Sequence, residues 1–106
     1  MTTFDDRERA YEAKFAHDEE MNFRANARRM KLLGLWAAEL LGRKGEAAQA
    51  YALEVVKADF EEAGHEDVVR KVSADLAGRA SPEEIRARLE SLLPVAKAQL
   101  MVELGN

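Results

Sequence analysis

The side chains that most often carry out catalysis are few in this chain and poorly spaced for that role. Its two histidines, His17 and His65, are far apart and belong to no HExxH pattern. Its three serines are Ser73, Ser81 and Ser91, and none lies in the GxSxG context of a nucleophile elbow. No glycine-rich phosphate-binding motif occurs. We therefore expect no enzyme activity, no catalytic residue and no bound cofactor.

The residues that bind metals are also unsuitably placed. Cysteine is absent, which excludes a Cys-based zinc site and a disulfide framework. Five acids gather in one stretch without the spacing of a calcium-binding loop: Asp59, Glu61, Glu62, Glu66 and Asp67. We interpret them as a solvated helix end, with His65 as a loop or cap residue beside Gly64. No metal is expected.

The first twenty residues contain a different kind of candidate site, one for binding. Phe4, Tyr11 and Phe15 follow one another at intervals of seven and four residues. This spacing places the three rings within about 40° of one another on one face of a helix. Seven acids and three bases surround them. The pattern is typical of a helix that lays an apolar stripe against another surface.

The helical face that carries these rings turns polar beyond Phe15. Its next positions are Asp18, Glu19, Asn22, Asn26 and Arg29, before Leu33 and Leu40 restore the apolar phase. Because unpaired polar side chains are costly to bury, we expect residues 1–18 to form a docking segment outside the core and 19–106 to form a helical bundle domain. An isolated helix of this length is marginal in water, so we expect the segment to be mobile in the free protein.

Two surfaces could bury the rings. The segment could fold back over its own bundle, or it could dock into a groove on a partner protein. Four bases follow the acidic segment with no acid between them: Arg24, Arg28, Arg29 and Lys31. These bases could be solvated and paired with nearby acids, or they could form a polar neck that sets the orientation of the docked segment.

The elements that position this segment are predicted to be helices. The helix that contains it ends in an apolar stretch of Met30, Leu33, Trp36, Ala37, Leu40 and Leu41. Gly34 is predicted to lie off its apolar face, and the GRKG sequence at 42–45 is predicted to end it. A second helix is expected from about Glu46 to Glu62, with an apolar side made of Ala48, Tyr51, Ala52, Val55, Val56 and Phe60.

Two more helices follow. The third has acids in its first turn and ends at Gly78, and its buried face is predicted to be Val68, Val69, Val72 and Leu76. The fourth begins with SPEEI, in which Ser81 and Glu84 form a capping box around Pro82. Its apolar phase continues past Pro94, so a kink is expected there rather than an end. The fold class is all-α, a small bundle of about four helices.

Composition limits the partners. A formal net charge of −4 and a pI of about 5.2 argue against a general binder of nucleic acid or anionic membranes. No stretch reaches the 18–20 apolar residues of a membrane span and no secretory h-region is present. We therefore expect a soluble, cytoplasmic, single-domain protein with no nucleic-acid partner and no direct membrane insertion, and we expect a monomer when it is free.

Three long stretches of the chain are similar to one known family. They are FDDRERAYEAKFAHD, KLLGLWAAELLG and DFEEAGHEDVVRK. With them, the chain resembles the zeta subunit of alphaproteobacterial F-type ATP synthases from Thr2 to about Leu104. Zeta subunits are inhibitors of ATP hydrolysis with a helical-bundle fold. The resemblance thus implies a regulatory protein without catalytic activity, located at the inner face of the membrane through the ATP synthase.

The resemblance also implies a partner for the docking segment. In zeta subunits the N-terminal segment, helical when bound, inserts between the catalytic alpha and beta subunits, reaches toward gamma and blocks rotation in the hydrolytic direction. By this resemblance the inhibitory region maps to residues 2–18. Helical phase and position then indicate the candidate partner-binding residues: Phe4, Asp5, Asp6, Arg7, Arg9, Tyr11, Glu12, Lys14, Phe15, His17 and Asp18.

Two other functions stay open. The protein could be a small-molecule-binding helical domain, such as a nucleotide sensor, with residues 1–18 as a lid. It could also be a self-associating bundle with no regulatory role. Titration with labelled nucleotide tests the first alternative, and light scattering across a range of protein concentrations tests the second.

Overall fold

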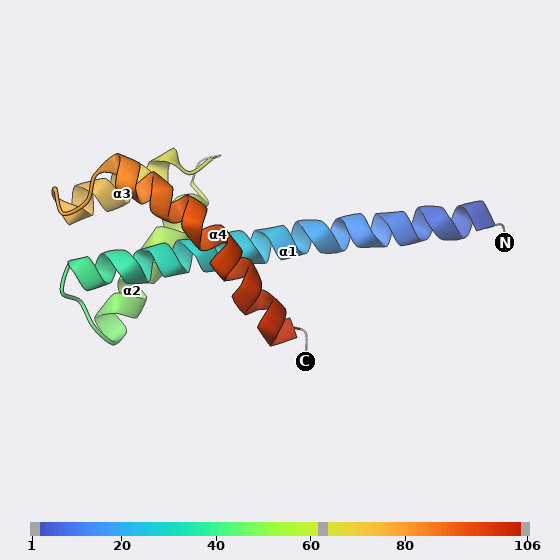
Figure 1. Ribbon diagram of the computed structural model, residues 1–106, viewed down its shortest axis with the longest axis horizontal. Helices are drawn as coiled ribbons and strands as arrows, with labels where there is room; N and C mark the ends of the chain where they lie inside the picture. The colour runs from blue at the N-terminus through green and yellow to red at the C-terminus, as the bar shows by residue number, and fades with distance from the viewer. Residues whose placement is uncertain (1–2, 62–63, 105–106) are drawn as a thin grey trace.

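The computed structural model describes residues 3–61 and 64–104, and the side chains of 18–61 and 64–103. Over these residues it contains four helices and no strand (Figure 1). The helices are α1 (Thr3–Leu40), α2 (Glu46–Asp59), α3 (Glu66–Leu76) and α4 (Pro82–Leu104). The predicted all-α class and the number of helices are confirmed.

Helix α1 is the axis of the fold. Its C-terminal half packs against the other three helices, whereas its N-terminal end extends beyond them (Figure 1). Helix α2 folds back along α1 after a short loop, and α4 crosses α1 near the middle of its length. The division of the chain at residue 18 into a docking segment and a bundle stays a prediction, as does the mobility of the segment in the free protein.

The core is formed by apolar side chains from all four helices. Fully buried residues include Met30, Leu33, Tyr51, Val55, Val68, Val72, Leu76 and Ile85. Each such side chain contributes roughly 1.5–3 kcal/mol of transfer free energy relative to exposure. The predicted buried face of α3 is confirmed, since all four of its apolar residues lie in this core.

Gly34 corrects one sequence prediction. It was expected off the apolar face, but it is buried against α2. A Cβ atom at this position would lie 2.6 Å from the Cα of Ala52 and 3.3 Å from the Cβ of Val55. The backbones of α1 and α2 therefore approach so closely that only glycine fits at the crossing without a shift of one helix.

The ends of the apolar stripes also differ from the prediction. Helix α2 ends at Asp59 rather than near Glu62, and Phe60 is its cap residue, with 58% of its surface exposed. Leu40 is 38% exposed because it is the last residue of α1, where the chain turns away from the core. Periodicity extended both stripes past the points at which the backbone leaves the bundle.

The predicted stop and start signals are confirmed. Gly42 and Gly45 adopt positive φ angles of 77° and 58° in the loop that ends α1. At the start of α4, the backbone N–H of Glu84 donates to Oγ of Ser81 at 3.1 Å, and the backbone N–H of Ser81 donates to Oε1 of Glu84 at 3.3 Å. This is the reciprocal capping box. Helix α4 then runs through Pro94 to Leu104 instead of ending at Leu93.

Candidate functional site

The candidate site suggested by the sequence lies at the start of α1. Asp18 is the one predicted contact whose side chain the structure describes, and it is exposed. The backbone of the other predicted contacts belongs to α1, but their side chains lie outside the described residues: Phe4, Asp5, Asp6, Arg7, Arg9, Tyr11, Glu12, Lys14, Phe15 and His17. Their roles in binding stay a prediction.

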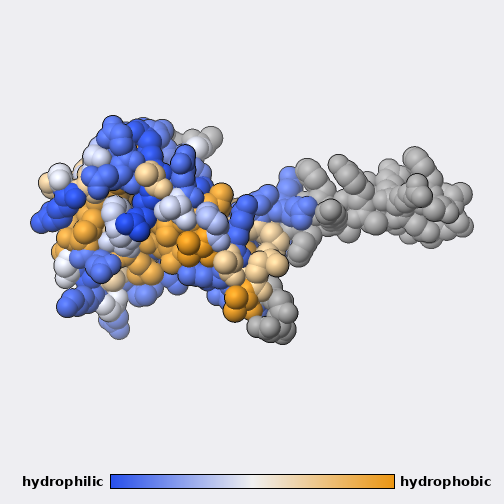
Figure 2. Space-filling model, in the orientation of Figure 1, coloured by the Kyte–Doolittle hydropathy of each residue, from blue (hydrophilic) through white to orange (hydrophobic). Residues whose placement is uncertain are grey.

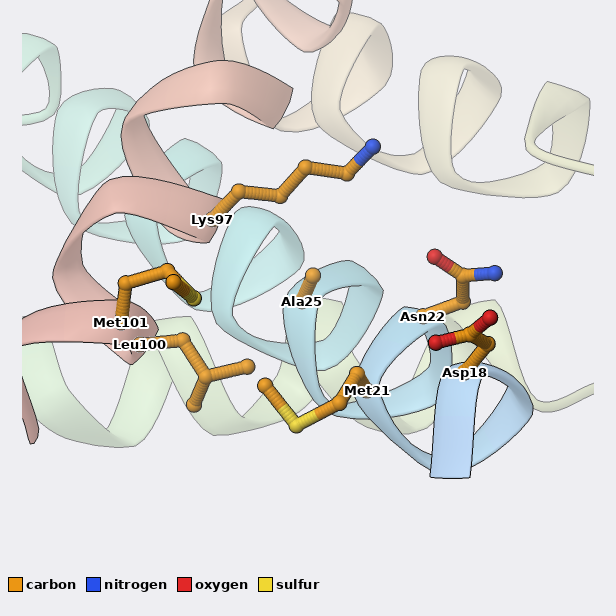
Figure 3. A pocket seen from close by; sticks show the side chains of 7 residues that line it. All are labelled: Asp18, Met21, Asn22, Ala25, Lys97, Leu100 and Met101. Carbon is orange, nitrogen blue, oxygen red and sulfur yellow. The ribbon is translucent and has the colours of Figure 1, made fainter. Parts of the chain in front are cut away.

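A hollow marks the place where α1 leaves the bundle (Figure 3). It has a volume of about 320 Å³ between α1 and α4, and it is lined by Asp18, Met21, Asn22, Ala25, Lys97, Leu100 and Met101. Met21 and Leu100 point toward one another across it, whereas Asp18 and Lys97 contribute opposite charges to its lining (Figure 3). The hollow is thus an apolar depression next to the predicted docking segment.

Exposed apolar side chains continue beyond this hollow along α4. Met101 and Val102 are 64% and 67% exposed. Figure 2 shows apolar atoms gathered at the C-terminal end of α4, close to the point at which α1 extends from the bundle. The base of the docking segment is therefore flanked by apolar surface.

On another side of α1, a polar cluster joins this helix to the α2–α3 connection. Nδ2 of Asn26 donates to Oδ2 of Asp59 at 2.7 Å, and Nη2 of Arg29 donates to Oδ1 of Asn26 at 2.5 Å. The ring of His65 lies between Asp59 and Arg29. Its Nδ1 is 2.9 Å from Oδ1 of Asp59, and its Nε2 is 2.8 Å from Nη2 of Arg29. Four side chains from three segments thus form one hydrogen-bonded network.

The geometry of this network defines the tautomer of His65. A guanidinium group can only donate hydrogen bonds, so Nε2 of His65 must accept the one from Arg29. Nδ1 then carries the proton and donates it to the carboxylate of Asp59. With the proton on Nδ1, the ring satisfies both neighbours.

Arg29 is the most enclosed base of this network. Burial lowers the pKa of its guanidinium, and the negative charge of Asp59 partly opposes that effect. Nη1 also reaches the backbone carbonyl of Leu89 in α4 at 3.4 Å. Arg29 therefore connects α1 to α4 as well as to the α2–α3 connection, and it helps to set the direction in which α1 leaves the bundle.

This network was not predicted from the sequence. Asn26 and Arg29 were interpreted as a polar interruption that keeps part of α1 out of the bundle, and Asp59 was interpreted as part of a solvated helix end. The side chain of Asp59 is only 8% exposed, because residues from α1 and the next turn cover it. The sequence did contain a signal for this network. Asn26 and Arg29 lie on the same helical face as Leu33, and polar groups on a buried face need hydrogen-bond partners.

Two of the bases that follow the docking segment pair with acids, as the first of the two interpretations expected. Arg24 contacts Glu20 at 2.6 Å, and Arg28 contacts Glu103 of α4 at 2.6 Å. Arg28 also donates to Oε1 of Gln99 at 3.2 Å. The pairs of Arg28 hold the C-terminal end of α4 against α1.

Two acids of the α2–α3 connection, Asp59 and Glu66, have separate partners. Glu66 accepts two hydrogen bonds from Arg86 at 3.1 and 2.7 Å, which hold the pKa of Glu66 below its ordinary value. Asp59 belongs to the network above. Within the described ranges, no group of three or more His, Cys, Asp or Glu side chains could hold a metal ion.

No helix in the described part of the chain is both long enough and apolar enough to span a membrane. Taken together, the described features are suited to holding a long helix in a fixed direction beside apolar contact surfaces.

Comparisons with known proteins agree with this geometry. A solved structure, obtained by solution NMR, shares 65% sequence identity with the chain and superposes with a TM-score of 0.75. The match covers 79% of this chain and 99% of that one. The comparison with curated proteins finds no match. Residues 1–99 match the family described as ATPase inhibitor subunit zeta. The chain therefore belongs to the zeta family of ATPase inhibitor subunits, whose role is regulatory rather than catalytic.

Proposed function

We propose that this protein inhibits ATP hydrolysis by an F-type ATP synthase by inserting residues 1–18 as a helix at the interface of the catalytic alpha and beta subunits, near gamma. Family membership supports an inhibitor of the ATP synthase. The observation that carries the finer proposal is that α1 is one helix from Thr3 to Leu40, with Met30, Leu33 and Ala37 buried in the core. The docking segment is thus continuous with a helix that the bundle holds.

This continuity favours docking energetically. Each aromatic ring that is buried removes about 150–250 Å² of surface from water, worth roughly 4–6 kcal/mol before costs. Ordering a free segment costs on the order of 1–2 kcal/mol for each residue. A segment that extends a fixed helix begins with its last turn already ordered, so helix formation needs no new nucleus. The bundle therefore lowers the cost of binding.

The proposed inhibition requires no chemistry from this chain. A helix of about 17 residues spans roughly 25 Å, which is long enough to enter a cleft between two subunits. A helix that binds one conformation of the catalytic interface more tightly than the others stabilises that conformation. Rotation in the direction of hydrolysis is then blocked, and the protein resides at the inner face of the membrane through its partner.

Deletion of residues 2–18 tests the proposal. We expect the truncated protein to keep the helical circular dichroism of the bundle and to lose inhibition of ATP hydrolysis by the purified alpha, beta and gamma assembly. Lys44→Ala, in the exposed α1–α2 loop, is the control and should inhibit as the unchanged protein does. Full inhibition by the truncated protein would show that another surface binds the enzyme.

A further inference from the structure

A second depression follows the outer side of α1, between α2 and α4, away from the polar network. One part, of about 470 Å³, is lined by Phe23, Arg24, Ala27, Arg28, Lys31, Val56, Leu100 and Glu103. An adjoining part, of about 310 Å³, is lined by Lys31, Gln49, Ala52, Leu53 and Val56. Lys31 and Val56 line both parts, so the two form one groove, which we call the outer groove.

Apolar side chains that the core does not use lie in or beside the outer groove: Phe23 and Leu53 line it, and Phe60 contacts Phe23. The rings of Phe23 and Phe60 are 5.7 Å apart and tilted by 34°, and they remain 59% and 58% exposed. Leu53 is 53% exposed further along α2. The two touching rings expose apolar surface beside the groove, and exposed apolar patches mark sites of interaction.

The charges of the outer groove are basic where it follows α1. Arg24, Arg28 and Lys31 are four and three residues apart and form one row, although the whole chain has a net charge of −4. Arg24 and Arg28 make ion pairs with Glu20 and Glu103, whose side chains are 56% and 52% exposed. The pair of Arg24 and Glu20 is exposed on both sides and contributes little to stability, so an incoming carboxylate can replace Glu20.

We propose that the outer groove binds an acidic amphipathic helix of the protein partner, with apolar anchors against Phe23, Val56 and Leu53 and with carboxylates against Lys31 and Arg24. Charge complementarity selects an acidic occupant, and the exposed rings select one with an apolar face. This inference rests on the proposed function, because the occupant belongs to the same ATP synthase that residues 1–18 enter. The groove adds a second contact that fixes the bundle outside the cleft.

The test uses the full chain and the purified alpha, beta and gamma assembly of the F-type ATP synthase as the probe. Lys31→Glu should raise the concentration for half-inhibition of ATP hydrolysis about tenfold, chiefly by slowing association, and should reduce its dependence on salt. Phe23→Ala should raise it by about tenfold through faster dissociation. Both residues are exposed, and circular dichroism verifies that the fold is kept.

Matched controls separate the groove from general effects of charge and surface. Lys44→Glu makes the same change of charge in the α1–α2 loop, and Val95→Ala truncates an exposed apolar residue of α4 that lines neither part of the groove. Both should inhibit as the unchanged protein does. If Lys31→Glu and Phe23→Ala also inhibit at unchanged concentration, the outer-groove proposal is overturned and the role of residues 1–18 stands. If the unchanged protein does not inhibit, the proposed function fails first.

Discussion

Two neighbouring stretches of α1, residues 22–29 and 30–38, face the same bundle with opposite chemistry. The second stretch buries Met30, Leu33 and Ala37 completely and contacts α2 through Gly34 without a side chain. The first stretch fully buries only Ala25, and its inward-facing polar residues, Asn26 and Arg29, contact their neighbours through hydrogen bonds. Apolar contact is non-directional, whereas hydrogen bonds require defined angles. The apolar stretch therefore supplies most of the stability, and the polar stretch defines the direction of the helix beyond the bundle.

The largest expected effect on stability concerns the apolar stretch, residues 30–38. Leu33→Ala should lower the free energy of unfolding by about 2–5 kcal/mol, because it removes buried surface and leaves a cavity in a close-packed core. Urea unfolding followed by circular dichroism measures the loss. Lys31→Ala, an exposed neighbour, should change stability by less than about 0.5 kcal/mol. A loss below about 1 kcal/mol for Leu33→Ala would contradict the assignment of the main core to residues 30–38.

A smaller and more local effect on stability is expected in the polar stretch, residues 22–29. Asp59→Ala removes the acceptor of Asn26 and His65, which are half-buried, so the cost should lie toward the lower end of the roughly 1–3 kcal/mol of an unpaired buried group. Amide hydrogen exchange should show a greater loss of protection in residues 22–29 than in 30–38. Glu61→Ala, which removes an exposed acid two residues away, should leave both stretches protected. Equal loss of protection in both stretches would show that the network and the core open as one unit.

The crossing of α1 and α2 gives a third test. Gly34→Ala should lower the free energy of unfolding by about 1–2 kcal/mol, since overpacking outweighs the better helix propensity of alanine. Differential scanning calorimetry detects the change as a lower Tm. Ala52→Gly should not rescue the variant, because the nearest atom to the new methyl group is the Cα of Ala52 rather than its Cβ. Full rescue would mean that the two backbones can move apart easily.

The smallest expected effect concerns a polar link between α2 and α3, which pack against the apolar stretch of α1. Tyr51 is buried, and its hydroxyl donates to Oδ2 of Asp75 at 2.9 Å. Burial raises the pKa of Asp75, but hydrogen bonds from Lys71 and Tyr51 outweigh it and leave that pKa below its ordinary value. Asp75 therefore stabilises the fold fully above about pH 4, and this contribution is lost as the pH falls through the lowered pKa.

Asp75→Asn should consequently flatten the loss of stability in acid. The carboxylate is partly exposed, so solvent screening keeps its contribution below about 1 kcal/mol. Urea unfolding at pH 7 and at pH 3 measures the difference for the unchanged protein and the variant. Glu83→Gln, at an exposed position of α4, is the control. A variant with the same difference between the two pH values as the unchanged protein would exclude Asp75 as a source of acid sensitivity.

The features predicted correctly from the sequence are those that depend on local residue spacing. Helix number, the buried face of α3 and the capping box at Ser81 follow from spacing of three or four residues, and all are confirmed. Gly34 could not be placed correctly, because its role depends on where α2 crosses α1. The network at Asn26 was missed because its partners lie 33 residues away in Asp59 and, through Arg29, 36 residues away in His65. Such pairs appear only when the helices are assembled.

The candidate binding surfaces also differ in whether they depend on local spacing or on the assembly of the helices. Aromatic spacing within residues 1–18 indicates a docking helix, which stays a prediction, whereas the outer groove was not predicted. Phe23 and Phe60 meet only because α2 ends beside the middle of α1. Periodicity assigned Phe60 to the core, and only the end of α2 at Asp59 explains why this ring is exposed.

The length of α1 has a mechanical consequence. From Asn26 to Thr3 the helix rises over 23 residues, or roughly 35 Å at 1.5 Å for each residue. A helix of this length acts as a lever whose pivot is the hydrogen-bonded cluster around Arg29. A tilt of about 5° at the pivot would displace the far end by roughly 3 Å, about the length of one hydrogen bond. The direction of the far end of α1 therefore depends on four side chains at the pivot: Asn26, Arg29, Asp59 and His65.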